Sequence, residues 1–452
     1  MTNSSPTPTS HNTAAGDVAT SQRFPIPEGT VPVGIGLLVA GVASYAFFKV
    51  GQQALGQQDF KPIVALWFAT FALAPGFFMP IEQEVGRALA HRRALGQGGG
   101  PVIKKVIPLT IGFTLLVSTL VLAGSPWLTR DFFEGYGLVT AALILAFVGY
   151  APAHLARGIC SGSGRFIDYG IVMGMDGATR ISGCVVLWLV GIKVVGAYAM
   201  VVALAPLLGV GIVYFRGALR TDDGPPATWA EITPNLGWLL GGSVLAAALV
   251  NAGPIGIDIL ARPDQAELVT QFGNGVLLAR VPLFLFQAVQ AALLPRLARL
   301  AASGDLGEFR LAFRRLVIVV VGVAFIGVSG SALVGPRILE VVYEGGLDRR
   351  TLSLLALGSG IYMLALATAQ AVIALHGHKW VALGWLCGMG SFVLVTWLAS
   401  DDLFLRVEYA SVVSSSCALA VFALALRSRL AAGVRPDVES MIEALTDRPI
   451  EG

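Results

Sequence analysis

The chain has 452 residues, of which 55% are hydrophobic and only 13% are charged. Its mean hydropathy of +0.74 lies far above that of soluble globular proteins, so the composition excludes a soluble domain and indicates an integral membrane protein. The formal net charge is +3, and the Lys and Arg residues form no basic stripe, so no nucleic-acid partner is expected.

The predicted elements begin after a polar tail. Residues 1–30 are rich in Ser, Thr and Pro and lack the pattern of a signal peptide, so we expect a disordered cytoplasmic tail. Apolar runs of about 20 residues then follow one another and favour helices over barrel strands, because the runs are continuous and do not alternate. They predict twelve transmembrane helices near residues 31–54, 61–84, 105–126, 137–156, 167–191, 194–216, 235–260, 267–294, 313–335, 351–375, 379–399 and 408–428.

The basic residues predict the orientation. They concentrate in the segments that follow the second and eighth predicted helices, on the same side of the membrane as the N-terminus. The excess of Lys and Arg on that side predicts that both termini are cytoplasmic. We therefore expect a multi-pass membrane protein in this orientation.

The two halves of the chain repeat one another. Lys104-Lys105 opens the third predicted helix, and Arg314-Arg315 opens the ninth about 210 residues later. Further matches at nearly the same displacement pair Gly124, Pro126, Leu128 and Glu134-Gly135 with Gly335, Pro336, Leu339 and Glu344-Gly345. With six helices in each half, equivalent helices run in the same direction, which predicts parallel repeats and a central cavity between two lobes.

The fold class expected is thus all-α integral membrane, with about twelve helices in two parallel six-helix repeats around a two-lobed central cavity. The expected divisions are a tail over residues 1–30, an N-terminal lobe over 31–216, a cytoplasmic inter-lobe linker over 217–234, a C-terminal lobe over 235–430 and a cytoplasmic tail over 431–452. The two lobes are suited to alternating access.

Several segments resemble a known family. They are the run Pro80 to Ala90 at the exit of the second helix, Arg157-Gly158 with Gly164-Arg165-Phe166, Tyr169 and Arg180 in the fourth and fifth helices, and the eighth-helix stretch from Leu278-Ala279-Arg280-Val281-Pro282 to Leu294-Pro295-Arg296-Leu297. In these loose patterns the chain resembles the flippases of the multidrug/oligosaccharidyl-lipid/polysaccharide exporter superfamily, in particular the O-antigen and polysaccharide flippase branch.

The resemblance, which covers nearly the whole chain, implies a V-shaped transporter that moves a polyprenyl-diphosphate-linked oligosaccharide across the cytoplasmic (inner) membrane for cell-surface polysaccharide assembly. It implies membrane lipids and the lipid-linked saccharide as partners, with glycosyltransferases and a polysaccharide polymerase as further ones. It implies no cofactor.

Basic residues inside the membrane are the candidate substrate-binding residues, because a diphosphate needs cationic partners where it leaves water. Arg280 lies near mid-membrane depth and has no acidic residue three or four positions away. It either binds substrate or pairs with another helix, for example with Asp258. Asn251 either lines the cavity or makes an interhelical hydrogen bond.

Arg180 is also near mid-depth, and Asp176 lies four residues before it on the same helix face. The two either neutralise one another or take part in binding and gating. Lys49 is a third candidate for substrate binding, although its long side chain could instead reach the outer interface. Asp258 is a candidate for coupling or gating, and an interfacial position is the alternative.

Other polar groups favour simpler interpretations. Glu82 and Glu84, with Arg87 at helical spacing from Glu84, predict a solvated, salt-bridged helix end. His376 and His378 have no third ligand in view, so no metal site is expected. No nucleophile elbow, phosphate-binding loop or paired-carboxylate pattern is present, and no enzyme activity is expected.

Two other functions are compatible with the sequence. One is a multidrug or small-cation exporter of the same fold, which predicts acidic residues in the N-terminal lobe where the first helix carries Lys49. The other is a non-transporting scaffold for cell-envelope synthesis.

Overall fold

The computed structural model describes residues 29–232, 236–283, 286, 297, 300–301, 304–344 and 346–432. Within these ranges no strand occurs, and eleven helices are long and apolar enough to cross a membrane. They are α1 Thr30–Leu55, α2 Gln57–Ala94, α3 Gly100–Ala123, α5 Gly137–Gly162, α6 Phe166–Leu189, α7 Val195–Phe215, α9 Leu236–Leu260, α12 Leu306–Leu333, α14 Arg349–Ala374, α15 His378–Leu398 and α16 Leu403–Ala432. The expected all-helical, multi-pass membrane fold is confirmed.

The helix predicted at 267–294 begins as α10, Ala266–Ala279. Arg280 ends α10 in a turn, and helical structure resumes at Val281. Pro282 explains the break, because it has no N–H to donate to the preceding helical turn. The predicted continuous helix is therefore interrupted at Arg280, and most of its second half lies outside the described residues.

Five short elements connect the long helices. They are α4 Ser125–Trp127, the π-helix η1 Leu128–Phe132, α8 Trp229–Ile232, the 3₁₀ helix η2 Pro263–Gln265 and α13 Gly335–Tyr343. The expected tails fall almost wholly outside the described residues, which begin at Gly29 and end at Ala432.

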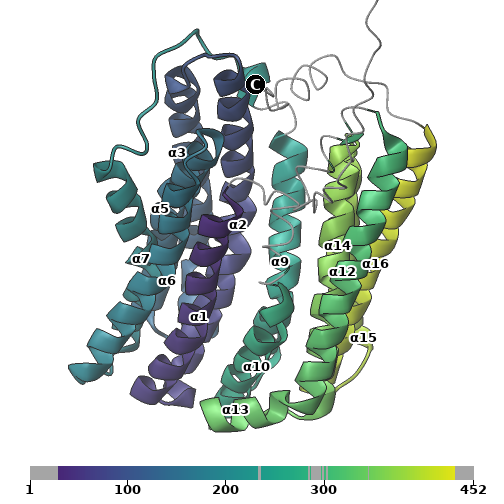
Figure 1. Ribbon diagram of the computed structural model, residues 1–452. Coiled ribbons are helices and arrows are strands. Elements are labelled where there is room, and N and C mark those ends of the chain that lie inside the picture. The colour runs from purple at the N-terminus through teal and green to yellow at the C-terminus, as the bar shows by residue number, and fades with distance from the viewer. Residues whose placement is uncertain are drawn as a thin grey trace, which may run out of the picture.

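Helix packing repeats between the two halves of the chain. In the first half α1 packs on α6, α2 on α5, α3 on α5, and α7 on both α5 and α6. In the second half α9 packs on α15, α10 on α14, α12 on α14, and α16 on both α14 and α15. This is the same pattern six helices later when α10 is counted with the eleven long helices. We call α1–α7 the N-lobe and α9–α16 the C-lobe. Figure 1 shows them side by side, with α2 and α9 in contact between them.

Glycines allow α1 and α6 to approach closely. A Cβ atom added to Gly36 on α1 would lie only 2.6 Å from the carbonyl oxygen of Gly170 on α6, and one added to Gly177 would lie 2.7 Å from Cα of Ala40. Any side chain at either glycine would push the helices apart. Gly170 begins the GxxxG sequence of α6, which thus serves helix packing.

The two ends of the bundle differ. Residues 217–232, which include α8, run along one end, and Figure 1 shows this linker end at the top. Arg92 of α2 donates to the carbonyl of Pro225 (2.8 Å) and to Glu231 (2.5 and 3.0 Å), while the N–H of Gly100 donates to the carbonyl of Asp222 (2.9 Å). The opposite end, at the bottom, contains α13, and we call it the α13 end. The linker is therefore attached to the N-lobe along much of its length.

Candidate functional site

Arg280 and Asn251 meet in the C-lobe. One Nη atom of Arg280 donates to Oδ1 of Asn251 (3.0 Å), and the other contacts the carbonyl oxygen of Val250. At a rise of about 1.5 Å per residue, Arg280 lies about 21 Å from the start of α10 and is therefore deep in the membrane. Two of its five N–H groups are engaged by these neutral partners, and the other three have no hydrogen-bond partner among the described residues.

The guanidinium of Arg280 also reaches the N-lobe. Its central carbon lies 5.3 Å from the ring centroid of Phe68 on α2, which places the cation against an aromatic face at the boundary between the lobes. No acidic side chain is within ion-pair distance of Arg280 among the described residues. Asp258, the partner considered above, instead lies 3.4 Å from Lys61.

Arg180 has the local partner that its sequence position suggests. Its Nη2 atom lies 2.6 Å from Oδ2 of Asp176 and donates to the hydroxyl of Tyr150 at 3.1 Å. The side chain is almost completely buried, and its guanidinium packs 4.7 Å from the ring of Trp67. Because the charge is compensated within the N-lobe, Arg180 is less available to an incoming anion than Arg280.

Aromatic residues of α2 stand between the two arginines. Trp67 faces Arg180, and the next residue, Phe68, faces Arg280. Phe71, one turn further along α2, also packs against Arg180, at 5.5 Å. The cations therefore lie against different faces of α2, one inside the N-lobe and the other at the boundary with the C-lobe.

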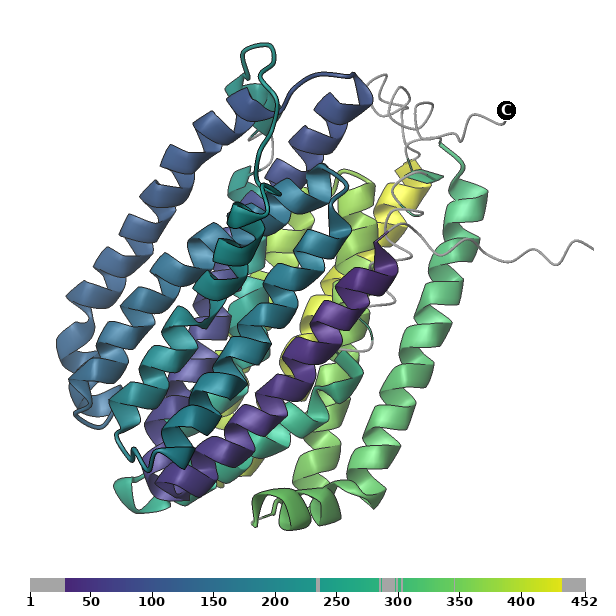
Figure 2. The ribbon, with the colours of Figure 1, turned by 60° about the vertical axis from the view of Figure 1, so that its left-hand side comes forward.

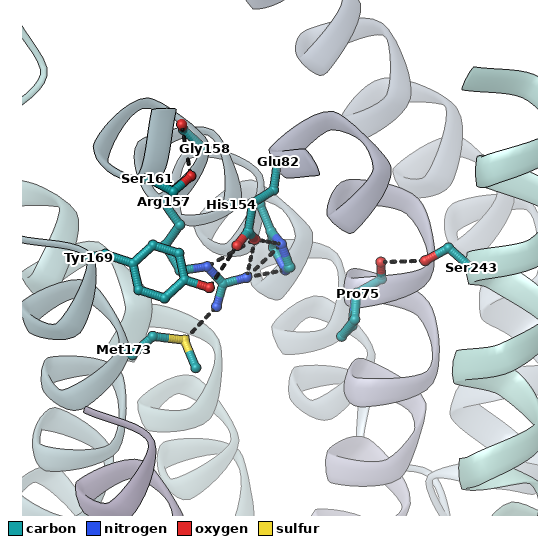
Figure 3. Close-up of polar contacts among 9 residues, drawn as sticks. All are labelled: Pro75, Glu82, His154, Arg157, Gly158, Ser161, Tyr169, Met173 and Ser243. Atoms are coloured by element: carbon teal, nitrogen blue, oxygen red, sulfur yellow. Dashed lines mark hydrogen bonds and ion pairs between the residues drawn. The ribbon is translucent and has the colours of Figure 1, made fainter. Parts of the chain in front are cut away.

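A second polar cluster lies nearer the linker end of the N-lobe, and Figure 3 shows Glu82 at its centre. The carboxylate accepts two bonds from Arg157 (3.0 and 2.7 Å) and one from the hydroxyl of Tyr169 (2.9 Å), while Nδ1 of His154 lies 2.8 Å away. Arg157 also reaches Sδ of Met173 at 2.7 Å. Glu82 thereby joins α2, α5 and α6.

The expectation of a solvated, salt-bridged helix end was wrong as to solvation for both acids, since the Glu84 side chain is only 7% exposed, and correct as to the ion pair of Glu84. Only 12% of the Glu82 side chain is exposed, because α5 and α6 cover it. Glu84 does pair with Arg87 at 2.8 Å, in the i,i+3 arrangement that the spacing predicts. The error has a clear cause: α2 continues to Ala94, so the helix does not end at Glu84.

The polar groups of the N-lobe form a column. His154 lies one turn from Tyr150 on α5, with ring centroids 6.4 Å apart, and therefore connects the Glu82 cluster to the pair of Asp176 and Arg180. Each part holds one carboxylate and one guanidinium. The column is electrically balanced, whereas the Arg280 region is not, so the residual positive charge lies at the lobe boundary.

Charged groups also cross between the lobes at the α13 end. Nζ of Lys61 on α2 lies 2.8 Å from Glu134 of its own lobe and 3.4 Å from Asp258 on α9 of the other. The side chains of Lys61 and Asp258 are 7% and 3% exposed, so this pair is shielded from water. Lys49 on α1 pairs with Glu344, just after α13, at 3.1 Å.

Neutral hydrogen bonds reinforce this junction. The amides of Gln52 on α1 and Asn274 on α10 exchange two bonds, of 2.7 and 3.1 Å. Tyr45 donates to the carbonyl of Leu277 (2.7 Å), and Tyr343 donates back to the carbonyl of Tyr45 (3.2 Å). The structure therefore has the lobes tied together at the α13 end.

The predicted site residues thus fall into three places. The structure brings Arg280 and Asn251 together at the lobe boundary and Arg180 and Asp176 together inside the N-lobe. Lys49 and Asp258 lie at the α13 end, in separate ion pairs. Their roles in binding or gating stay predictions.

Sequence reasoning missed His154 and named Arg157 only within the family resemblance, although both complete the Glu82 cluster. A signal was available. The two residues lie three positions apart on an otherwise apolar helix, so they share one helix face. Their acidic partner is 72 positions from His154 along the chain, and only the packing of α2 on α5 reveals it.

Comparisons of the sequence and of the structure with known proteins show which proteins this chain resembles. A protein of Mycobacterium tuberculosis and one of Mycobacterium bovis, both named as uncharacterized, are each 27% identical over 410 residues, covering 87% of this chain and 90% of theirs. No family model matches the sequence. A solved outward-facing structure of a multidrug resistance MATE family transporter of the MOP superfamily matches with a TM-score of 0.69 at 14% identity, covering 90% of this chain and 95% of that one.

A MATE structure in the bent conformation matches with a TM-score of 0.65 at 13% identity, over 93% of this chain and 97% of that one. These identities are low, so the likeness establishes the fold. The chain therefore has the fold of MATE transporters. These matches are to MATE transporters and do not distinguish the oligosaccharide flippase branch from other proteins of this fold.

Proposed function

We propose that this chain is a membrane transporter in which the two lobes move against one another, so that a central site faces each side of the membrane in turn. The support is threefold: the repeated packing of the lobes, the ion pairs and amide bonds that gather at the α13 end of the lobe boundary, and the MATE fold. Elsewhere on that boundary, among the described residues, the hydroxyl of Ser243 on α9 donates to the carbonyl of Pro75 on α2 at 3.3 Å (Figure 3). We further propose that the linker end faces the cytoplasm, as the distribution of Lys and Arg favours. The family resemblance of the sequence supports the inner membrane as its location.

The proposed cargo is an anionic amphiphile, namely a polyprenyl-diphosphate-linked oligosaccharide. Arg280 is the observation that carries this choice. A mid-membrane arginine is costly and is usually paired with an acid or used for function. Arg280 has only neutral partners among the described residues, Asn251 and the carbonyl of Val250, and it lies where the lobes meet. A diphosphate would supply the missing anion, and the unused N–H groups would bind its oxygens.

A multidrug exporter is the alternative, because a structure of the same fold belongs to a protein described as a multidrug resistance transporter. A cationic drug would need an acidic residue at the lobe boundary. Arg280 repels such a cargo, Asp176 is already paired with Arg180, and Asp258, at the α13 end of the boundary, is already paired with Lys61. The charges at the lobe boundary therefore favour an anionic cargo over a cationic one. They do not discriminate against a neutral drug, which the transport test must include.

The test uses purified protein in vesicles that contain a fluorescent polyprenyl-diphosphate oligosaccharide, with movement between leaflets measured by quenching from outside. We expect wild type to move the lipid and Arg280→Gln to lose at least ten-fold in rate while inserting normally. Arg337→Gln, an exposed arginine on α13, is the matched control and should behave as wild type. Equal rates for wild type and Arg280→Gln would remove Arg280 from the cargo site.

The cargo class has its own test. If wild-type vesicles leave the oligosaccharide lipid in place but accumulate a cationic dye, the exporter alternative replaces the flippase proposal. In cells, depletion of the protein should leave the lipid-linked saccharide in the cytoplasmic leaflet, and expression of wild type should reverse this. An unchanged distribution would contradict the flippase role.

Movement of the lobes can be tested at the α13 end. The side-chain amides of Gln52 and Asn274 are in contact across the lobes, so a short bifunctional reagent should link Gln52→Cys to Asn274→Cys once the four native cysteines are replaced. Linking should stop transport, and cleaving the linker should restore it. Undiminished transport by the linked protein would rule out opening of this end.

A further inference from the structure

The C-lobe carries a groove on the surface that faces lipid. It runs between α12, α14 and α16 and has a volume of about 550 Å³. Its walls are apolar: Phe313, Val317 and Val321 line it from α12, and Leu419 and Leu426 line it from α16. Figure 2 shows α12 at the edge of this lobe, where lipid would surround it.

The groove has the length of one membrane leaflet. It extends along α12 from Arg310 to Val321, which at about 1.5 Å per residue corresponds to about 16 Å. Half the hydrocarbon core of a bilayer is about 15 Å thick. A single acyl chain from the leaflet at the linker end can therefore lie along the groove with its headgroup at the same depth as Arg310.

The mouth of the groove is basic. Arg310 of α12 and Arg427 of α16 both line it and are exposed. Arg310 donates to the carbonyl of Leu430 (3.3 Å), and neither arginine is within ion-pair distance of an acidic group in the described part of the chain. Two unpaired guanidinium groups beside an apolar channel are complementary to a phosphate that carries an acyl chain.

The N-lobe differs at the corresponding place. There the basic residues that open α3 are engaged by the linker: Lys104 lies 3.4 Å from Asp223, and Lys105 donates to the carbonyl of Ala227 and packs on the ring of Trp229. The chain itself thus supplies the partners in the N-lobe. In the C-lobe the arginines of the groove have no such partner among the described residues.

We propose that this groove binds one anionic glycerophospholipid of the leaflet at the linker end, with an acyl chain between α12 and α16 and the phosphate between Arg310 and Arg427. This site is separate from Arg280 and does not depend on the identity of the cargo. A neutral lipid would gain only from the apolar walls and would bind less tightly.

The test measures binding to the purified, delipidated full-length protein by native mass spectrometry, with palmitoyl-oleoyl phosphatidylglycerol and the matching phosphatidylcholine as probes. Basic residues near a headgroup contribute about 1 kcal/mol each, so Arg310→Gln with Arg427→Gln should weaken phosphatidylglycerol binding about thirty-fold. Arg130→Gln with Arg337→Gln removes the same charge at the α13 end and should leave binding unchanged.

A second variant tests the apolar channel. Ala423 lines the groove and is exposed, so Ala423→Trp should fill the groove without disturbing the core and should weaken binding of both lipids. Equal affinity of wild type for the two lipids, or full binding by either groove variant, would overturn the proposal. Transport activity is not part of this readout, so failure of the lipid site and failure of the transport proposal are distinguishable.

Discussion

Replacement of Glu82 by Gln should loosen the N-lobe, because the carboxylate holds three helices together. Glu82→Gln keeps the shape but removes the anion that receives two bonds from Arg157, a side chain that is only 13% exposed. Removing one partner of a buried pair costs about 3–5 kcal/mol. Some exposure remains at both side chains, so we expect about 3 kcal/mol. Arg157→Gln should cost about the same.

The double variant provides the decisive measurement. With both charges removed, neither a lone anion nor a lone cation is left, so the combined cost should fall about 2 kcal/mol short of the sum of the single costs, within the range found for residues in contact. The unfolding free energy is measured by denaturant titration in mixed micelles. Arg216→Gln breaks the more exposed pair with Asp168 and should cost less than about 1 kcal/mol. Single costs that add within about 0.5 kcal/mol would refute the reasoning.

Three further predictions concern other contacts. Asp176→Asn should lower the melting temperature by several degrees, because it leaves Arg180 buried without its anion. Adding Arg180→Gln should restore most of the loss. Transport by that folded double variant would show that Arg180 has a structural role. Lys61→Met removes the cation between the carboxylates of Glu134 and Asp258 and should open the α13 end. Opening should speed the labelling of Gln52→Cys by an impermeant thiol reagent. An unchanged labelling rate would count against a gate at this end. Gly170→Leu should force α1 from α6 and reduce the yield of folded protein, measured by size-exclusion chromatography, while a normal yield would contradict the close packing.

Most of the fold could be predicted from the sequence, because a bilayer requires long apolar runs and the helices that they form are nearly continuous. The predicted span 137–156 corresponds to α5 and 379–399 to α15, with ends that differ by a few residues. The exception is α10. Pro282 indicates a kink in that helix. Whether the helix breaks completely at Arg280 depends on which partners bind the carbonyl groups that lose their helical hydrogen bonds, and hydropathy does not predict those partners.

The candidate site could be predicted only in part. The pairing of Asp176 with Arg180 follows from helical spacing, so the sequence already suggested it. The contact of Arg280 with Asn251 joins residues 29 positions apart, and that of Glu82 with His154 joins residues 72 positions apart. Such contacts depend on which helices pack together and how they are rotated. A single sequence contains no direct signal for either.

The attachment of the linker has a mechanical consequence. A linker between two lobes is often assumed to be flexible. Here Arg92 and Gly100 of the N-lobe bind the linker between Asp222 and Glu231. Under the movement proposed above, it would travel with the N-lobe as an arm, and rotation of the lobes would be transmitted to the C-lobe from Ile232 onward. A protease cut beside Gly224 should leave both fragments in place, whereas lengthening the arm with glycines should detach it and slow the rotation without altering either lobe.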